Sequence, residues 1–157
     1  GALSPLQASR NSGLGDELGG RLQALLPPLP AGGARQGMTW ADSTEFPLLA
    51  DAFAGTERAL TSYHVADGEV EGTGGRKALK IESTGSYTRS GHRVQGEQEL
   101  EMTANGTRTG VHLVGLDGVL LSARGSDAGD MTISVPALGQ TVPVKQSGSF
   151  TITRVGR

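Results

Sequence analysis

Polar and apolar residues alternate near the end of the chain, over residues 141–153. One parity holds all the large apolar side chains of this stretch and consists of Val142, Val144, Gln146, Gly148, Phe150 and Ile152. A period of two predicts a β-strand with one face exposed to water. Residues 131–135 alternate in the same way, and the intervening segment 136–140 contains turn-forming Pro and Gly. We therefore predict two adjacent antiparallel strands, which need further sheet or a helix to cover their apolar face.

The same pattern continues upstream and predicts the rest of a sheet. Further strands are expected at residues 38–46, 56–70, 78–87, 92–103, 107–114 and 119–123. Between them we expect a loop or a short helical turn at 48–55, turns at Asp67-Gly68 or 72–76, Ser90-Gly91, Asn105-Gly106 and Asp117-Gly118, and a bend or bulge at 125–129. The predicted fold is mainly β, a long, curved antiparallel meander sheet of about seven strands with one N-terminal helix packed on it. A small barrel or a sandwich is the alternative.

The predicted helix rests on a stripe of leucines, since Leu14, Leu18 and Leu22 recur at helical spacing. Several glycines interrupt the stripe and weaken the helix, so we expect it to form only when it packs on the sheet. The predicted organisation is a flexible arm at 1–12 and one β-rich domain at 13–157, made of a helix (13–26), a Pro-rich connector (27–37) and strands (38–155).

Composition narrows the class of protein. The chain has 157 residues and a formal charge of −2, so nothing favours binding to nucleic acid. It contains no cysteine, which excludes disulfides, thiol catalysis and Cys-ligated metal within it. No apolar run reaches the length of a transmembrane helix. No signal peptide is recognisable, and we expect a signal or anchor segment to belong upstream of this chain.

No group of residues predicts catalysis, a metal site or a cofactor site. The three histidines each stand alone in a different predicted strand, namely His64, His92 and His112. The glycine-rich segment 72–77 lacks the spacing of a phosphate-binding loop and joins two predicted strands. Asp127 and Asp130 flank Gly129, but nothing else is expected to converge on them and form a site for acid–base chemistry. The chain is therefore predicted not to be an enzyme.

Three segments resemble known proteins. They are Leu29-Pro30, Gly37-Met38-Thr39-Trp40 and the stretch MTISVPALGQTVPVKQSGSFTITR at 131–154. In these segments the chain resembles bacterial secreted or lipoprotein-type β-domains and, more distantly, the periplasmic lipoprotein-carrier superfamily (LolA/LolB-like). The resemblance implies a half-open β-sheet that holds helices in its concave side and shelters acyl chains there. It also implies a periplasmic, cell-surface or secreted location.

The sequence thus predicts a non-enzymatic extracytoplasmic β-domain that binds a hydrophobic ligand, a lipid or an acylated partner. The candidate ligand-lining residues are Leu14, Leu18, Leu22, Trp40, Leu79, Leu100, Met102 and Phe150. The alternative is a structural or interaction subunit of a cell-surface or membrane-associated assembly, which would bind a protein partner through its edge strands or its N-terminal arm. Neither hypothesis calls for a cofactor, a metal, a nucleic-acid partner or a transmembrane segment.

Overall fold

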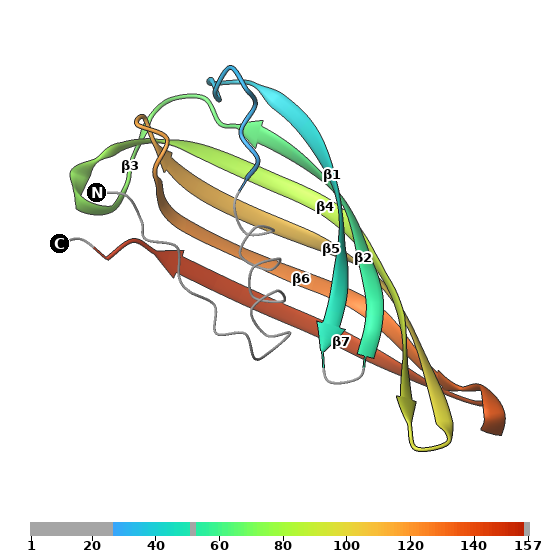
Figure 1. Ribbon diagram of the computed structural model, residues 1–157. Helices are drawn as coiled ribbons and strands as arrows, with labels where there is room; N and C mark the ends of the chain where they lie inside the picture. Colours follow the sequence, from blue (N-terminus) through green and yellow to red (C-terminus); the bar gives the residue numbers. More distant parts are fainter. Residues whose placement is uncertain (1–26, 51–52, 156–157) are drawn as a thin grey trace, which may run out of the picture.

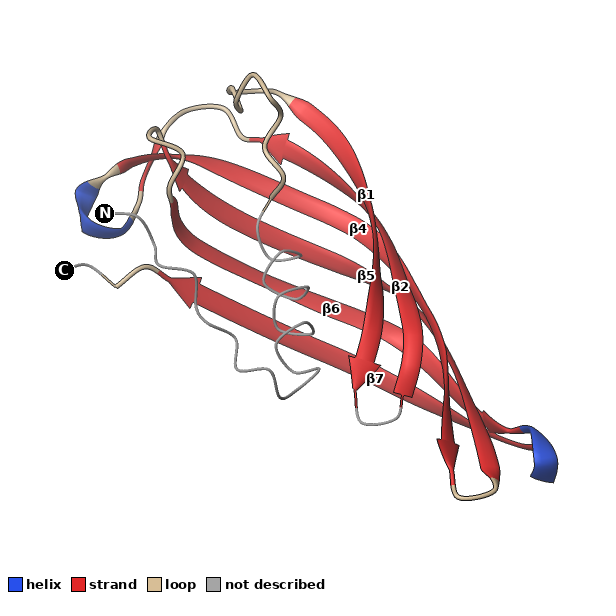
Figure 2. Cartoon of the chain, in the orientation of Figure 1, coloured by secondary structure: helices blue, strands red, loops and turns tan. Residues whose placement is uncertain are grey.

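The computed structural model describes residues 27–50 and 53–155, and these residues are mostly β-strand (Figures 1 and 2). The strands are β1 (Thr39–Ala50), β2 (Phe53–Val65), β3 (Val70–Glu71), β4 (Lys77–Gln95), β5 (Gln98–Gly115), β6 (Leu120–Val135) and β7 (Gln140–Thr153). Two short 3-10 helices, η1 (Thr73–Gly75) and η2 (Pro136–Leu138), lie in the connections. The predicted arm and helix, at 1–12 and 13–26, lie outside the described residues.

All seven strands belong to one antiparallel sheet in the order β1-β2-β4-β5-β6-β7, with the short β3 paired to β4. The long strands thus follow one another as a meander, which confirms the predicted mainly β, antiparallel meander sheet; the helix predicted to pack on it lies outside the described residues. The sheet is strongly curved, and within the described ranges β1 and β7 are its two open edges (Figure 1). Pro47 and Pro143 lie in these two edge strands, where a missing N–H interrupts the fewest ladder hydrogen bonds.

The strands are longer than predicted, because several expected interruptions are part of the sheet. β4 continues through Ser90-Gly91, β5 continues through Asn105-Gly106, and β6 stays paired across 125–129. The turns predicted at the first two sites are therefore wrong. The loop predicted at 48–55 is also wrong in the main, since β1 runs to Ala50 and β2 begins at Phe53.

The connections themselves fall at other glycine-containing sites. The turn between β4 and β5 lies at Gly96, inside a stretch for which a strand was predicted. The turn at Asp117-Gly118 is confirmed, and so is the connection at 136–140, where η2 ends at Gly139 in the left-handed conformation. The segment 66–76 also connects strands as predicted, although β3 and η1 occupy part of it.

The two faces of the sheet differ sharply in chemistry. Residues paired across neighbouring strands share a face, and alternate residues along one strand lie on opposite faces. One side, here called the apolar face, includes Trp40, Tyr63, Ile81, Tyr87, Met131 and Phe150. The other side, the hydroxyl face, includes Ser43, Ser62, Thr84, Ser86, Thr107, Thr109, Ser126, Ser147 and Ser149. The alternation predicted from the sequence therefore places apolar and polar residues on opposite sides of one sheet.

The best-packed part of the apolar face lies at one end of the sheet. Tyr63, Val65, Ile81 and Val114 are buried there, and partly buried neighbours from the connector and from β1 cover them. The Trp40 ring stacks on the Tyr63 ring at a centroid distance of 5.1 Å. The Trp40 indole N–H also donates a hydrogen bond to the Pro28 carbonyl oxygen over 2.9 Å. The connector is thereby attached to the apolar face at the point where the described chain begins.

The glycines inside the strands gather on the apolar face. By strand register these are Gly55, Gly85, Gly91, Gly106, Gly110, Gly125, Gly129 and Gly148. Several of them lie beneath a side chain from another strand: a Cβ on Gly125 would come within 2.6 Å of the Phe150 ring. Glycine in a strand interior marks a bend or a close approach of another group. These residues therefore allow the sheet to curve around its own aromatic side chains.

Candidate functional site

A charged cluster lies in the middle of the apolar face, on β2, β4 and β5. The side chain of Glu57 is only 2% exposed, and two arginines bind it. Arg89 Nε donates to Glu57 Oε2 over 2.5 Å, and Arg108 Nη2 donates to Glu57 Oε1 over 2.9 Å. The arginine side chains are 25% and 26% exposed, so both are partly accessible to solvent, whereas the carboxylate that they bind is buried. The cluster holds two positive charges and one negative charge.

The ring of Tyr87 lies within this cluster. The guanidinium carbons of Arg89 and Arg108 are 4.7 Å and 5.0 Å from its ring centroid, distances at which a cation is attracted to the electron-rich ring face. The Tyr87 hydroxyl accepts a hydrogen bond of 3.0 Å from Gln146 Nε2 on β7. Tyr87 thus packs against both guanidinium groups, which helps to fix their position.

Apolar side chains occupy the apolar face beyond this cluster, away from the packed end. Five of them form what we call the open patch: Met102, Met131, Ile133, Val142 and Val144, from β5, β6 and β7. Four are half-buried, and Val142 is 55% exposed. The open patch begins in the row of residues that contains Arg89, because Arg89 pairs with Ala104 and Ala104 pairs with Met131. A guanidinium group and an exposed apolar surface therefore lie next to each other.

Five of the candidate lining residues fall within the described ranges, and all five lie on the apolar face. Trp40 and Leu79 pack against the buried cluster at one end of the sheet. Phe150 lies over Gly125, in the same row of paired residues as Trp40 and Tyr63. Leu100 and Met102 lie toward the opposite end of β5, so the five side chains do not converge on one pocket. Leu14, Leu18 and Leu22 lie outside the described residues.

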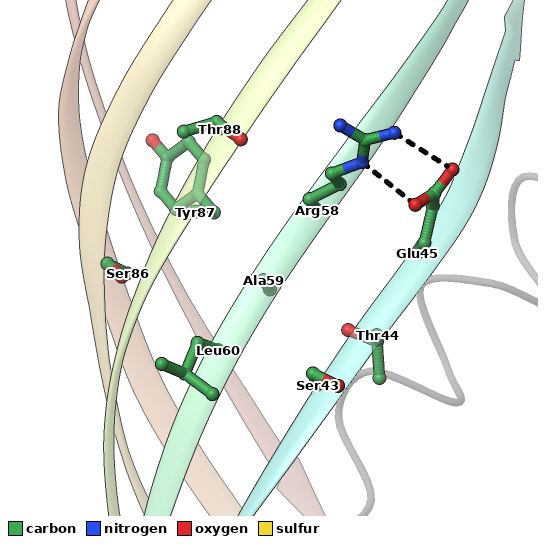
Figure 3. Close-up of a pocket in the computed structure, with 9 residues that line it drawn as sticks. All are labelled: Ser43, Thr44, Glu45, Arg58, Ala59, Leu60, Ser86, Tyr87 and Thr88. Atoms are coloured by element: carbon green, nitrogen blue, oxygen red, sulfur yellow. Dashed lines mark hydrogen bonds and ion pairs between the residues drawn. The ribbon is translucent and has the colours of Figure 1, made fainter.

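The hydroxyl face has two shallow, open hollows. The first, of about 470 Å³, extends over β1, β2 and β4, and its lining residues are Ser43, Thr44, Glu45, Arg58, Ala59, Leu60, Ser86, Tyr87 and Thr88 (Figure 3). Its charged groups bind each other, since Arg58 Nε lies 2.8 Å from Glu45 Oε2. The hydrogen bond from Arg58 and its positive charge hold the pKa of the Glu45 carboxyl below its usual value. No nucleophile with a neighbouring base is present among these lining residues.

The second hollow, of about 600 Å³, lies over β2, β4 and β5 near the turn at Gly96. His92, Glu99 and Glu101 are among its lining residues, and His92 pairs with Glu101 across the two strands. All three side chains are exposed. A wide hollow lined by solvated side chains offers little exclusion of water, which most small-molecule sites require.

The remaining sequence candidates do not come together. His64 and His92 are exposed on the hydroxyl face, whereas His112 is buried on the apolar face. Asp127 and Asp130 lie on opposite faces of β6, because Asp127 pairs with Arg108 and Asp130 with Asn105. Across residues 27–50 and 53–155, no group of three or more His, Asp or Glu side chains is placed to hold a metal ion.

Sequence reasoning missed the central cluster, although the chain contained a signal for it. Glu57, Arg89 and Arg108 have the parity of the apolar residues in their strands, and a charged residue at such a position is unusual. The parity of these charged residues can be recognised only when the full lengths of β4 and β5 are known. The turns predicted at Ser90-Gly91 and Asn105-Gly106 would have placed Arg89 and Arg108 at strand ends, where charges are common.

Comparison with protein-family models, with curated proteins and with solved structures finds no match to this chain. Within the described part of the chain, no helix has the length and apolar character needed to span a bilayer.

Proposed function

We propose that this protein is a non-enzymatic extracytoplasmic β-domain that binds a hydrophobic ligand, a lipid or an acylated partner on its apolar face. The observation that supports the proposal is the open patch, where four half-buried apolar side chains and the exposed Val142 continue the buried face of a single curved sheet. Contiguous apolar surface on a folded domain commonly marks a binding site. The resemblance to lipoprotein-type domains and to the lipoprotein-carrier superfamily supports the same function and a periplasmic, cell-surface or secreted location.

The proposed mechanism is passive shelter of an apolar chain. Burying apolar area stabilises a complex by about 25 cal/mol per Å². The curvature of the sheet lets side chains from several strands contact one ligand, whereas a flat sheet would present a single plane. Trp40, Leu79 and Phe150 would then form the packed end of the site, and Leu100 and Met102 its open end.

The N-terminal leucines are proposed to contribute to the same site. The described chain begins with the buried Pro27 and with Pro28, whose carbonyl oxygen accepts the hydrogen bond from Trp40. Because Trp40 lies on the apolar face, this hydrogen bond holds Pro28 on that side of the sheet. Leu14, Leu18 and Leu22 precede Pro27 by 5 to 13 residues in the sequence, and we propose that they compete with a ligand for the apolar face.

The experiment that tests the proposal is native mass spectrometry of protein isolated gently from its source, followed by uptake assays. An added mass of lipid size supports the proposal. After delipidation, the protein should take up a fluorescent fatty acid or a lipopeptide, and an Ile133→Asp variant should take up less. The matched control is Ser134→Asp, which adds the same charge at the next residue but on the hydroxyl face. Failure of the delipidated protein to take up either probe would refute the proposal.

A second candidate function is an interaction subunit, and the charges of the two edge strands favour it. β1 contains only acidic charged residues, Asp42 and Glu45, whereas β7 contains only Lys145. Edge strands expose unpaired backbone groups that another strand can pair with. A protein-sized addition in the native mass spectrum, lost at high salt, would favour this function over ligand shelter.

A further inference from the structure

We propose that Arg89 and Arg108 hold the negatively charged head of an amphiphile, a carboxylate or a phosphate, whose apolar chain lies on the open patch. This inference rests on the proposed function and names the chemical class of its ligand. The inference is based on the position of two guanidinium groups, which converge at the border between the packed end of the apolar face and the open patch.

The two arginines have enough hydrogen-bond donors to bind an anion in addition to Glu57. A guanidinium group has five N–H donors in a planar fork that matches carboxylate and phosphate oxygens. Each of these two groups donates one hydrogen bond to Glu57, so most of their donors are not used on that carboxylate. Both side chains are about a quarter exposed, so neither arginine is fully closed off from a ligand on the apolar face. The cluster keeps one net positive charge after Glu57 is counted.

The position of the other charges selects the side on which an anion binds. Asp127 pairs with Arg108 on β6, and Asp42 lies on β1 in the same row of paired residues. The row of Arg89 holds no acidic residue except the buried Glu57, and consists of Phe46, Glu57, Arg89, Ala104, Met131 and Val144. An anion is therefore favoured on the Arg89 side of the cluster, which is also the side of the open patch.

The two arginine side chains are also held in place before any ligand binds. Tyr87 packs against both guanidinium groups, and each of these groups also donates a hydrogen bond to Glu57. A preorganised pair of arginines loses little side-chain entropy when it binds an anion. The same contacts would also serve a purely structural role, which would hold β2, β4 and β5 in register. The two roles differ in one measurable property, the selectivity for the charge of the head group.

The test compares four probes with the same chain: dodecanoate, dodecyl phosphate, dodecanol and dodecyltrimethylammonium, each below its micelle concentration. Affinity for the delipidated full chain is measured by competition with a fluorescent probe. The expected result is that the anionic probes bind at least about tenfold more tightly than dodecanol. Arg89→Gln should reduce this ratio to near one, because the anion is favoured on the Arg89 side of the cluster. The matched control is Arg93→Gln, which removes an exposed arginine from the same face outside the cluster and should leave the ratio unchanged.

Each outcome decides the inference. A preference for dodecanoate alone or for dodecyl phosphate alone identifies the anion and supports the proposal. Equal affinity for dodecanol and the anions, or preference for the cation, overturns it while the proposed function stands. Binding of none of the probes overturns both. If Arg89→Gln does not fold, Arg89→Lys replaces it, because lysine keeps the charge without the planar fork of donors. The ratio of anionic-probe affinity to dodecanol affinity should then fall to a value between that of the wild type and one. An unchanged ratio overturns the proposal.

Discussion

The hydroxyl of Tyr87 on β4 accepts a hydrogen bond of 3.0 Å from Gln146 Nε2 on β7, although β5 and β6 lie between these strands. Gly106 and Gly129 make this contact possible, because they are the residues of β5 and β6 in the same row. A Cβ on Gly106 would come within 2.6 Å of the Tyr87 hydroxyl oxygen. The two glycines thus let one tyrosine link the middle of the sheet to its edge strand.

The first prediction concerns this glycine-lined passage. Gly106→Ala should destabilise the protein by about 2 kcal/mol or more, since the new methyl group meets the Tyr87 ring and the Ala128 backbone oxygen. Gly148→Ala is the matched control on the same face, where the nearest atom is the end of the Asp127 side chain at 3.0 Å. We expect it to cost less than about 1 kcal/mol. Urea unfolding of the two variants measures the difference, and equal losses would contradict the role of Gly106.

The second prediction concerns the buried carboxylate. Glu57→Gln should lower the free energy of unfolding by about 2–3 kcal/mol, because it leaves two partly buried guanidinium groups without their counter-charge. Glu45→Gln removes the carboxylate of the Arg58 ion pair, whose side chains are 71% and 59% exposed, and should cause no measurable change. Thermal unfolding of both variants tests this contrast. A loss for Glu57→Gln no larger than that for Glu45→Gln would show that the central cluster contributes no stability.

The third prediction concerns alkaline pH. Burial raises the pKa of the Tyr63 phenol above its ordinary value of 10.0, and the Asp42 carboxylate adds to the rise. The neutral phenol is therefore favoured in the folded state. The stability that it contributes is fully present below pH 10 and is lost as the pH rises through the higher folded-state pKa. Tyr63→Phe cannot ionise, so its stability should fall less steeply above pH 10 than that of the wild type.

Trp40 provides the measurement for this prediction. It is the only Trp in the chain, and its ring stacks on Tyr63. Urea unfolding followed by Trp40 fluorescence at a series of alkaline pH values gives the slope for each protein. Parallel slopes for the wild type and Tyr63→Phe would mean that Tyr63 ionises equally in the folded and unfolded chains.

The fourth prediction tests the open patch with a graded ligand. For a series of fatty acids bound there, each additional buried methylene group should strengthen binding by up to about 0.8 kcal/mol until the chain outgrows the patch. Ile133→Ser should weaken binding of the longer chains and leave the shortest almost unaffected. Ser134→Ala, a change on the opposite face of β6, is the control and should leave the whole series unchanged. Affinity that is independent of chain length would place the ligand elsewhere.

The sequence by itself determined those features of the sheet that depend on a few neighbouring residues, namely the faces of a strand and some of the turns. Alternation of polar and apolar residues in β7 identified its two faces, because side chains along a strand point to opposite sides whatever the strand pairs with. The turn at Asp117-Gly118 was also predictable, since Gly118 has a φ of +79°, which favours glycine. The proline-containing connection before β7 was identified in the same way, since Gly139 in it adopts the left-handed conformation that favours glycine.

Only the tertiary structure decided which glycines were turns and which were strand. Gly106 follows Asn105 as turn glycines often do, yet it sits in the middle of β5, where it makes room for Tyr87. That role depends on a side chain from another strand, so no property of the pair Asn105-Gly106 reveals it. The same holds for the central cluster: Glu57, Arg89 and Arg108 are far apart in the sequence and meet only through the register of β2, β4 and β5. Local preferences act over a few residues, whereas curvature and register depend on contacts between strands.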